Sequence, residues 1–301
     1  MYDLKMTPEE IAQKAEAVRN NIPYEKDLID LNTLPDDVVT TEERFITTGA
    51  GETHIYIHRP AKTTGEPLPL LIYIHGGAHI KPYRETDRVL CRIISSRVGC
   101  VIVDIDYKLA PEYPYPIALN ECYDTVMWAI ENAKELNVIP EKLALIGNSA
   151  GGNLVAALAI MAKDRKGFKP LLQVLDYPVL DLDTDPLEKS GEMKTREAQR
   201  YIRYIYIHKM LHHSRHPYVS PVFADEETIK DIAPALIITA QHDNLLKEAE
   251  DYAMNLIAAG VPVTVKRFKN SKHAFLINLH DEYKEALDVI VDGLKKCYFV
   301  N

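Results

Sequence analysis

The chain has 301 residues, of which 47% are hydrophobic and 26% are charged, and its formal net charge is −9. This length fits one large α/β domain or two ordinary ones, with enough apolar residues for a sizeable core. The acidic balance, with no basic block or stripe, argues against a nucleic-acid partner or an anionic membrane surface.

The N-terminal segment and the cysteines indicate in which cellular compartment the protein is expected. MYDLKMTPEE lacks the apolar core of a secretory signal. The chain also contains no run of about eighteen apolar residues, so no membrane span is predicted. The cysteines are scattered and have no C-x-x-C spacing, which is typical of reduced, buried thiols; they are Cys91, Cys100, Cys122 and Cys297. We therefore expect a cytoplasmic protein without disulfides.

The first predicted element is a helix that follows Thr7. Thr7 occupies the N-cap position, Pro8 is the first helical residue and Glu10 completes a capping box. An apolar stripe at helical spacing follows, formed by Ile11, Ala15 and Val18. Residues 44–60 then predict a β-hairpin that turns at residues 49–51 and ends at Pro60.

Short, wholly apolar runs follow the hairpin and alternate with amphipathic helical stretches such as 116–134 and 244–259. The runs span residues 70–75, 100–106, 143–147, 171–175, 235–239 and 263–268. Strands buried on both faces and alternating with helices predict a parallel sheet covered on both sides. The hairpin adds an antiparallel edge, so the sequence predicts an α/β fold with a mixed sheet in one domain, residues 1–301.

One stretch interrupts the alternation. Between residues 182 and 220 no strand is predicted, but residues 195–211 predict a helix. One face of that helix contains Ile202, Ile205, Tyr206 and Met210. A helical insertion over the carboxyl ends of the strands is where a lid would lie, and the N-terminal helix could pack beside it. We therefore expect cap elements from about residues 1–40 and 182–220.

The stretch LALIGNSAGGNL, residues 143–154, places Ser149 in a G-x-S-x-G pattern between an apolar run and a helix. This is typical of a nucleophile on a sharp strand-to-helix turn, although a glycine-rich bend alone could give the same match. A serine nucleophile needs a base, and the base needs an acid to orient it. Asp243 follows the strand at 235–239 and His273 follows the next one, so both are expected at the same sheet edge as Ser149.

An oxyanion hole is predicted upstream, where the apolar run 70–75 ends in His75 and is followed by small residues. Backbone N–H groups of such a loop can turn toward a substrate oxygen and stabilise its developing charge. The candidate donors are Gly76, Gly77, Ala78 and, at the start of the helix that follows the serine, Ala150.

Several segments together resemble the hormone-sensitive-lipase-like carboxylesterases of the α/β-hydrolase superfamily. They occur in the family's order between residues 70 and about 290: HGGA (75–78), DYKLAPEYPYPIAL (106–119), GNSAGGNL (147–154), YPVLD (177–181), HDNLLKE (242–248) and HAF (273–275). The resemblance implies an α/β-hydrolase fold with a small helical cap and a catalytic triad of Ser149, Asp243 and His273. It also implies oxyanion donors at Gly77, Ala78 and Ala150.

The chain departs from the family pattern at two positions. The oxyanion loop usually reads HGGG, and Ala78 replaces its last glycine; alanine resists positive φ, so we expect a loop conformation that a non-glycine residue reaches. The elbow usually reads GDSAGG, and Asn148 makes that position neutral. His75 and Asn148 are therefore interpreted as supporting residues, and neither change touches the triad.

Other titratable residues have simpler explanations. An acidic stretch has calcium-loop spacing, formed by Asp181, Asp183, Asp185 and Glu192, but Pro186 stands where such a loop needs glycine. A histidine group, formed by His208, His212, His213 and His216, lacks the glutamate of H-E-x-x-H. We expect no metal at either. His242 adjoins Asp243 and cannot present its ring to it, so it is not the base.

The remaining candidates concern the pocket and its loops. His79 is either a pocket wall or an ordinary loop histidine, and Glu112 and Glu248 are expected to anchor loops through hydrogen bonds. The candidate pocket-wall residues are Tyr83, Tyr204, Tyr206 and Met210. A place in the ordinary hydrophobic core would explain these residues equally well.

The expected function is hydrolysis of small-molecule esters with short acyl chains, through an acyl-enzyme and without a metal or organic cofactor. The acyl-chain length is implied by the family resemblance alone. The same triad would also serve an amidase or a lactonase, and a hydrolase fold can act as a non-catalytic ligand-binding protein. The sequence leaves undecided whether an edge strand pairs with that of a second copy to form a homodimer.

Overall fold

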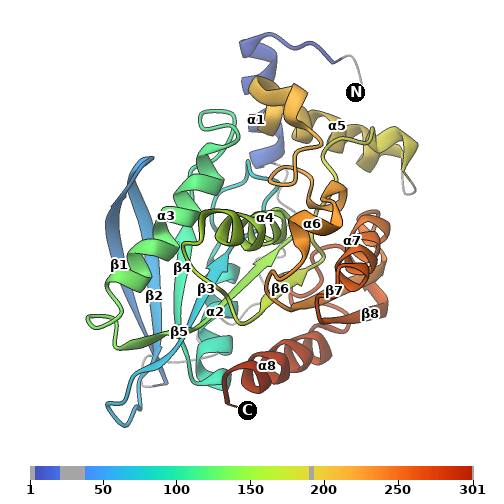
Figure 1. Cartoon of the computed structure of the whole chain (residues 1–301). Helices are drawn as coiled ribbons and strands as arrows, with labels where there is room; N and C mark the ends of the chain where they lie inside the picture. Colours follow the sequence, from blue (N-terminus) through green and yellow to red (C-terminus); the bar gives the residue numbers. More distant parts are fainter. Residues whose placement is uncertain (1–3, 21–37, 190–192, 300–301) are drawn as a thin grey trace.

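A single eight-stranded sheet forms the centre of the computed structural model, which describes residues 4–20, 38–189 and 193–299 (Figure 1). The strand order is β1-β2-β4-β3-β5-β6-β7-β8. The pairs β1–β2 and β2–β4 are antiparallel, and all other neighbours are parallel. The predicted α/β fold with an antiparallel edge at the N-terminal hairpin is confirmed.

Each predicted strand is present in the sheet. The strands span Val39–Thr48 (β1), Gly51–Pro60 (β2), Leu68–Ile74 (β3), Val101–Asp106 (β4), Val138–Asn148 (β5), Gln173–Asp176 (β6), Ala235–His242 (β7) and Val263–Lys272 (β8). β5 begins earlier than its apolar run because Val138 and Ile139 pair with the start of β3, before a register shift between Pro69 and Leu70. Polar residues within this irregular stretch concealed the extension from a search for apolar runs.

Helices cover both faces of the sheet. They span Pro8–Asn20 (α1), Glu85–Val98 (α2), Ile117–Glu131 (α3), Ala150–Arg165 (α4), Met193–Ile207 (α5), Glu226–Ile229 (α6), Leu246–Ala258 (α7) and Tyr283–Phe299 (α8). Short 3₁₀ turns span Pro186–Glu188, His208–His213 and Pro221–Phe223.

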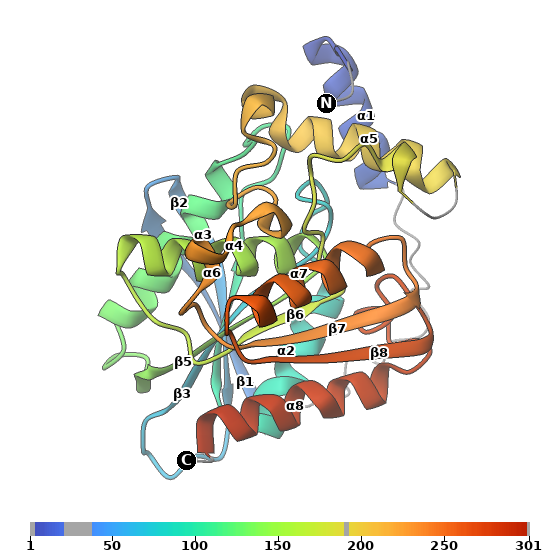
Figure 2. The ribbon, with the colours of Figure 1, turned by 45° about the vertical axis from the view of Figure 1, so that its right-hand side comes forward.

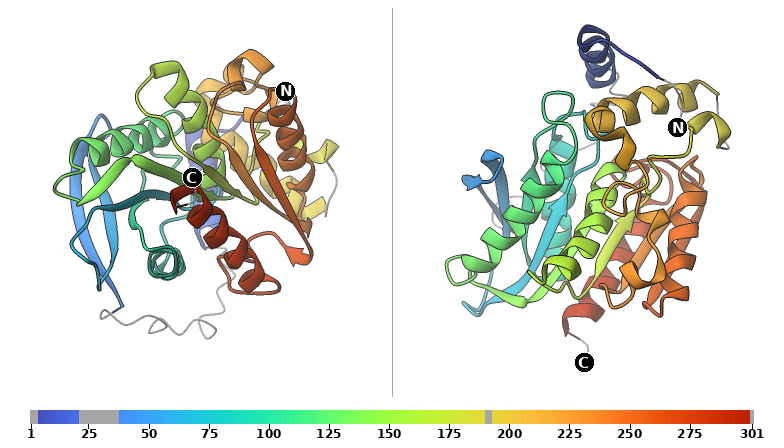
Figure 3. Two further views of the ribbon diagram at one scale, coloured as in Figure 1. Left: turned by 60° about the horizontal axis from the view of Figure 1, so that its bottom comes forward. Right: turned by 45° about the horizontal axis from the view of Figure 1, so that its top comes forward.

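The core is divided by the sheet into two apolar clusters. In β3, Leu70 and Ile72 belong to the cluster beneath α3, α4 and α7, whereas Leu71 and Tyr73 belong to the cluster beneath α2 and α8. Figure 3 shows these two helical layers on opposite sides of the strands. The alternation explains why the strands read as continuous apolar runs, since side chains on both faces are buried.

The N-terminal helix α1 begins with the predicted capping box. Thr7 N donates to Glu10 Oε2 at 2.8 Å, and Glu10 N donates to Thr7 Oγ1 at 3.2 Å. α1 lies beside α5 at one end of the molecule (Figure 2), where the Lys14 ammonium sits 4.4 Å from the Tyr201 ring centroid. Of the predicted N-terminal cap segment, residues 1–3 and 21–37 lie outside the described residues.

The helix predicted over residues 195–211 is shorter than expected. α5 ends at Ile207, and the 3₁₀ turn that follows contains Met210 at φ −136°. The His208 ring bonds the Ile205 carbonyl through Nδ1 at 2.9 Å, which satisfies an acceptor that a continuing helix would use. Ile205 is fully buried, so the predicted apolar face does point into the core.

The structure also bears on the expectations about the cysteines and about membrane-spanning helices. The four cysteines are free thiols, and three of them are buried. Among the residues that the structure describes, no helix is long and apolar enough to cross a bilayer.

Candidate active site

Ser149 occupies a sharp turn between β5 and α4. Its backbone has φ 52° and ψ −112°, an uncommon conformation for a residue other than glycine. The flanking glycines make the turn possible. A Cβ on Gly147 would lie 2.4 Å from the carbonyl oxygen of Gly151, and a Cβ on Gly151 would lie 1.9 Å from that of Ile74. The G-x-S-x-G pattern is therefore a steric requirement of the turn.

Replacement of Gly151 with alanine is expected to lower the free energy of unfolding by about 3 kcal/mol, because the new methyl group overlaps the β3 backbone. Urea unfolding followed by circular dichroism measures this change. Gly260→Ala is a matched control, because a Cβ there meets no atom within 4 Å, although φ +77° adds local strain. Equal stability of the Gly151→Ala variant and the unmodified protein would contradict the steric account.

Side chains from three loops at the carboxyl ends of the strands meet at this turn. Ser149 Oγ lies 3.0 Å from His273 Nε2, and His273 Nδ1 lies 2.8 Å from Asp243 Oδ2. Asp243 follows β7, and its second carboxylate oxygen accepts the Leu245 N–H at 2.9 Å. His273 follows β8. The structure thus brings together the three residues that the sequence analysis selected from distant positions in the chain.

The Asp243 carboxylate sets the state of the His273 ring. An ionised carboxylate can accept hydrogen bonds but cannot donate them, so the ring donates from Nδ1 to Asp243. The Nε2 lone pair then faces the serine hydroxyl. Partial burial of the ring lowers the pKa of His273, while the Asp243 charge and hydrogen bond raise it. The charge and the hydrogen bond of Asp243 together outweigh the effect of burial, so the net pKa of His273 is raised.

This raised pKa predicts the pH dependence of the expected ester hydrolysis, with His273 as the base. A base acts only when neutral, so kcat/KM should fall as pH decreases through the His273 pKa, which lies above the ordinary value of 6.5. The plateau should lie at alkaline pH. A pH–rate profile of kcat/KM measures the midpoint, and a midpoint below 6.5 would contradict the proposed influence of Asp243.

The loop after β3 presents the predicted oxyanion donors at the same cavity. Gly76, Gly77 and Ala78 line it together with Ser149. Ala150 is the first residue of α4, and a helix leaves its first N–H groups without intrahelical partners. Gly77 adopts φ 118°, and its carbonyl accepts Lys81 N at 2.8 Å, which closes the loop into a turn.

The loop at Ala78 adopts a conformation that a non-glycine residue reaches only at a cost. Ala78 adopts φ 60° and His79 adopts φ 59°, so the loop has positive φ at two consecutive non-glycine residues. An L-residue reaches this left-handed region at a cost of about 1 kcal/mol. The turn closed by Lys81 N and the packing of His79 hold both residues there, which explains how alanine replaces glycine.

His75 and Asn148, the predicted supporting residues, both lie next to Gly76 of this loop. The buried His75 ring stacks on Tyr107, with ring centroids 4.3 Å apart, and its Nδ1 lies 2.6 Å from the Gly76 carbonyl oxygen. Asn148 is 2% exposed and pairs across the strands with Asp176, whose pKa is raised well above its usual range by burial. A neutral amide at Asn148 avoids placing a second carboxylate beside this buried one.

The cavity over Ser149 has a volume of about 330 Å³ and is walled on one side by α5. Of the four candidate wall residues, only Tyr206 lines it. Tyr83 instead donates to Asp104 Oδ2 at 2.5 Å, the Tyr204 hydroxyl accepts Met6 N at 3.4 Å, and Met210 packs on the core. Tyrosine hydroxyls with distant partners are not recognisable from local sequence.

His79 is a cavity wall rather than an exposed loop residue. Its ring stacks on Tyr206 with centroids 3.7 Å apart and an interplanar angle of 7°. Burial, together with the nearby His75, lowers the pKa of His79 to about 3, so the ring is neutral at physiological pH. The stack connects the loop after β3 to α5.

The two glutamates anchor loops, as predicted. Glu248 Oε1 accepts the Leu180 N–H at 2.7 Å, and its Oε2 lies 2.5 Å from Lys189 Nζ. Glu112 forms an ion pair with Arg19 at 2.5 Å, which ties α1 to the loop after β4. His242 is exposed and does not line the cavity over Ser149.

The side chains in the two sequence patterns that resemble metal sites make hydrogen bonds and ring contacts with other protein groups. Asp181 accepts the N–H groups of Asp183 and Thr184, and Asp185 caps a 3₁₀ turn. Glu192 lies outside the described residues. His212, His213 and His216 lie in ring contact with one another and with Tyr218, whereas His208 lies against Tyr204.

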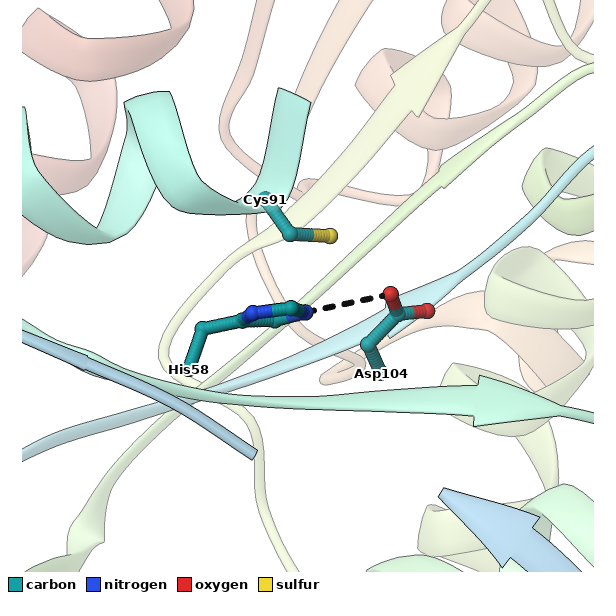
Figure 4. Close-up of side chains that lie close together, drawn as sticks. All are labelled: His58, Cys91 and Asp104. Atoms are coloured by element: carbon teal, nitrogen blue, oxygen red, sulfur yellow. Dashed lines mark hydrogen bonds and ion pairs between the residues drawn. The ribbon is translucent and has the colours of Figure 1, made fainter. Parts of the chain in front are cut away.

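Among the described residues, one other cluster brings three potential metal ligands together: His58, Cys91 and Asp104, all fully buried (Figure 4). Asp104 Oδ2 lies 3.3 Å from His58 Nε2 and also accepts the Tyr83 hydroxyl. Burial, reinforced by the Asp104 charge, raises the pKa of Cys91 well above its usual range, so the thiol stays protonated and is a poor ligand. The cluster is best described as a buried hydrogen-bond network around Asp104. Its members come from β2, α2 and β4, so no local motif reveals it.

Comparisons with known proteins agree with this geometry. Residues 71–277 match the family model of the alpha/beta hydrolase fold. The chain is 34% identical over 243 residues to an arylesterase of Saccharolobus solfataricus, covering 80% of this chain and 78% of that protein. It is 29% identical over 232 residues to an ethyl acetate hydrolase of Pseudomonas putida, covering 75% and 72%.

A solved structure of an esterase from Pyrobaculum calidifontis superposes with a TM-score of 0.82 at 31% sequence identity, covering 97% of this chain and 99% of that chain. The strand order, the turn at Ser149 and the matched sequence range thus agree with one another. The chain belongs to the α/β-hydrolase fold family and, within it, to the hormone-sensitive-lipase-like carboxylesterases.

Proposed function

We propose that this protein is a serine carboxylesterase that hydrolyses short-chain acyl esters of small molecules through an acyl-enzyme on Ser149. The observation that supports it most directly is the pair of hydrogen bonds from Ser149 through His273 to Asp243, at 3.0 and 2.8 Å, at the wall of a cavity. The similarity to an arylesterase and an ethyl acetate hydrolase supports the same reaction class.

The proposed reaction begins when Ser149 Oγ attacks the ester carbonyl and His273 Nε2 takes its proton. Asp243 fixes the ring tautomer and stabilises the imidazolium that forms. His273 then protonates the leaving alcohol. A water molecule, deprotonated by the same histidine, attacks the acyl-enzyme and releases the acid.

Backbone N–H groups would stabilise the tetrahedral intermediate. The proposed donors are Gly77, Ala78 and Ala150, with Gly76 completing the loop. One such donor typically contributes about 10²–10³-fold to the rate, because it is already oriented toward the developing charge. The positive φ values at Gly77 and Ala78 support a loop whose amides are held in place before substrate binds.

The size of the cavity supports a short acyl chain. Its volume of about 330 Å³ is near the lower end for ligand pockets, which run from about 300 to 1,000 Å³. α5 covers the cavity, α1 packs on α5, and the stack of His79 on Tyr206 closes one wall. We infer that α1 and α5 act as the cap within one domain, and that the cap limits acyl length.

A series of 4-nitrophenyl esters from acetate to palmitate tests this proposal. We expect kcat/KM to be highest between acetate and butyrate and to fall steeply from octanoate onward, because longer chains exceed the cavity. A maximum at long chains would contradict the cavity argument. Parallel assays of 4-nitroacetanilide and γ-butyrolactone test the amidase and lactonase alternatives, which would show comparable or higher kcat/KM.

A further inference from the structure

The cavity over Ser149 has positively charged walls. Lys81, Arg84 and Arg203 line it, and none of the described residues that line it is an aspartate or a glutamate. This contrasts with the chain as a whole, whose net charge is −9. The excess of cations at the cavity is therefore local and does not follow from composition.

The carboxylates that pair with the two arginines lie outside the cavity wall. Arg84 Nε donates to Asp87 Oδ2 at 3.1 Å, and Asp87, in the first turn of α2, is fully buried. Arg203 NH2 lies 3.7 Å from Glu248 Oε2, and its NH1 donates to the Thr184 carbonyl at 2.8 Å. Each ion pair thus presents its positive member to the cavity.

Arg203 also has unused hydrogen-bonding capacity. The residue is 1% exposed, and neither Nε nor NH2 has a hydrogen-bond acceptor among the described residues. Leaving a buried charged donor without an acceptor is unfavourable, so an oxygen-rich ligand group that reaches it gains an unusually strong hydrogen bond.

Lys81 and Arg84 lie close enough to influence one another. Burial, together with the Arg84 charge, lowers the pKa of Lys81. A group whose cationic form is disfavoured by a neighbouring cation is stabilised when an anion binds between them. Both residues follow the oxyanion loop directly, so such an anion would belong to the bound substrate.

From this arrangement we propose that the preferred substrates carry a second, ionised acid group: monoesters of short dicarboxylic acids, or esters of alcohols that bear a carboxylate. The inference rests on the proposed esterase activity and names the substrate class of the same site. The carboxylate would lie against the cationic wall while the ester carbonyl lies at Ser149.

Matched pairs of esters test the preference. For the acyl side, monoethyl glutarate is compared with the ethyl ester of glutaric acid monoamide; for the alcohol side, 4-acetoxybenzoate is compared with 4-acetoxybenzamide. Within each pair only the charge differs. We expect kcat/KM for the anionic ester to exceed that for the neutral one by about 10- to 100-fold in at least one pair, the range of one hydrogen bond to a charged group. The pair that responds identifies which side of the substrate meets the wall.

Variants locate the effect. Lys81→Met and Arg203→Met are expected to lower the anionic-to-neutral ratio of kcat/KM by about tenfold each, mainly through KM for the anionic ester. A purely structural role would lower both rates together and leave the ratio unchanged. Lys209→Met removes the same charge from an exposed cap position that does not line the cavity, and it should leave the ratio as it is.

The outcomes separate this inference from the proposed function. Hydrolysis of the neutral esters with no preference for the anionic ones in either pair overturns the anionic-substrate proposal alone. A preference that Lys81→Met and Arg203→Met both leave intact overturns the assignment of the wall. Absence of hydrolysis with every ester, neutral or anionic, overturns the esterase proposal itself.

Discussion

Replacement of Ser149 with alanine is expected to lower kcat for 4-nitrophenyl acetate by about 10⁴–10⁶-fold, the range found when a hydrolase triad loses its nucleophile. Ser149 Oγ is the atom that faces His273 Nε2 at 3.0 Å, and alanine leaves that base without a hydroxyl to activate. Steady-state hydrolysis by the two proteins, purified identically, measures the effect. The missing acyl-enzyme should also abolish any pre-steady-state burst.

The substitution is not expected to disturb the fold. Alanine tolerates the backbone conformation of Ser149 as well as serine does, and the Ser149 N–H that donates to Asp176 O at 2.8 Å is retained. Equal thermal midpoints for the two proteins would verify this. If the variant kept more than a few per cent of the activity, Ser149 would not be the nucleophile.

Asp243→Asn is expected to lower kcat/KM by about 10⁴-fold while leaving the hydrogen-bond geometry nearly intact. The amide NH₂ would donate to His273 Nδ1, so the ring would carry its proton on Nε2 and could no longer accept one from Ser149. The pKa of His273 should also fall, because the carboxylate that raises it is gone. Hydrolysis rates across the pH range measure both effects.

Asp251→Asn provides the matched control for that experiment. Asp251 lies on α7, the helix that follows the Asp243 loop, and pairs with the exposed Lys247 at 2.6 Å. The same carboxylate-to-amide change there should leave kcat/KM unchanged. A similar loss in both variants would indicate a general effect of charge rather than control of the His273 tautomer.

Most of the fold was predictable because buried parallel strands and amphipathic helices leave a periodic signal. The runs that became β3, β4 and β7 are apolar because both of their faces are covered, and the order of strand and helix then determines the topology. The meeting of Ser149, Asp243 and His273 was expected for the same reason, since all three follow strands that end at one edge.

What the sequence did not reveal depends on contacts between distant segments. Tyr83 was a candidate wall residue, but the buried Asp104 on β4 holds its hydroxyl. The positive φ of Ala78 depends on the turn at Lys81 N and on the stack of His79 against Tyr206. The cationic wall combines Lys81 and Arg84 from one loop with Arg203 from α5, and no local pattern connects them.

The most direct test of the account is covalent labelling with a fluorophosphonate, followed by mass spectrometry of the intact protein and of its peptides. We expect one equivalent to attach at Ser149, with ester hydrolysis lost in proportion to labelling, and no adduct on the Ser149→Ala variant. An unlabelled protein that still hydrolyses esters, or an adduct on another residue that accounts for the lost activity, would contradict the proposal that Ser149 is the activated nucleophile.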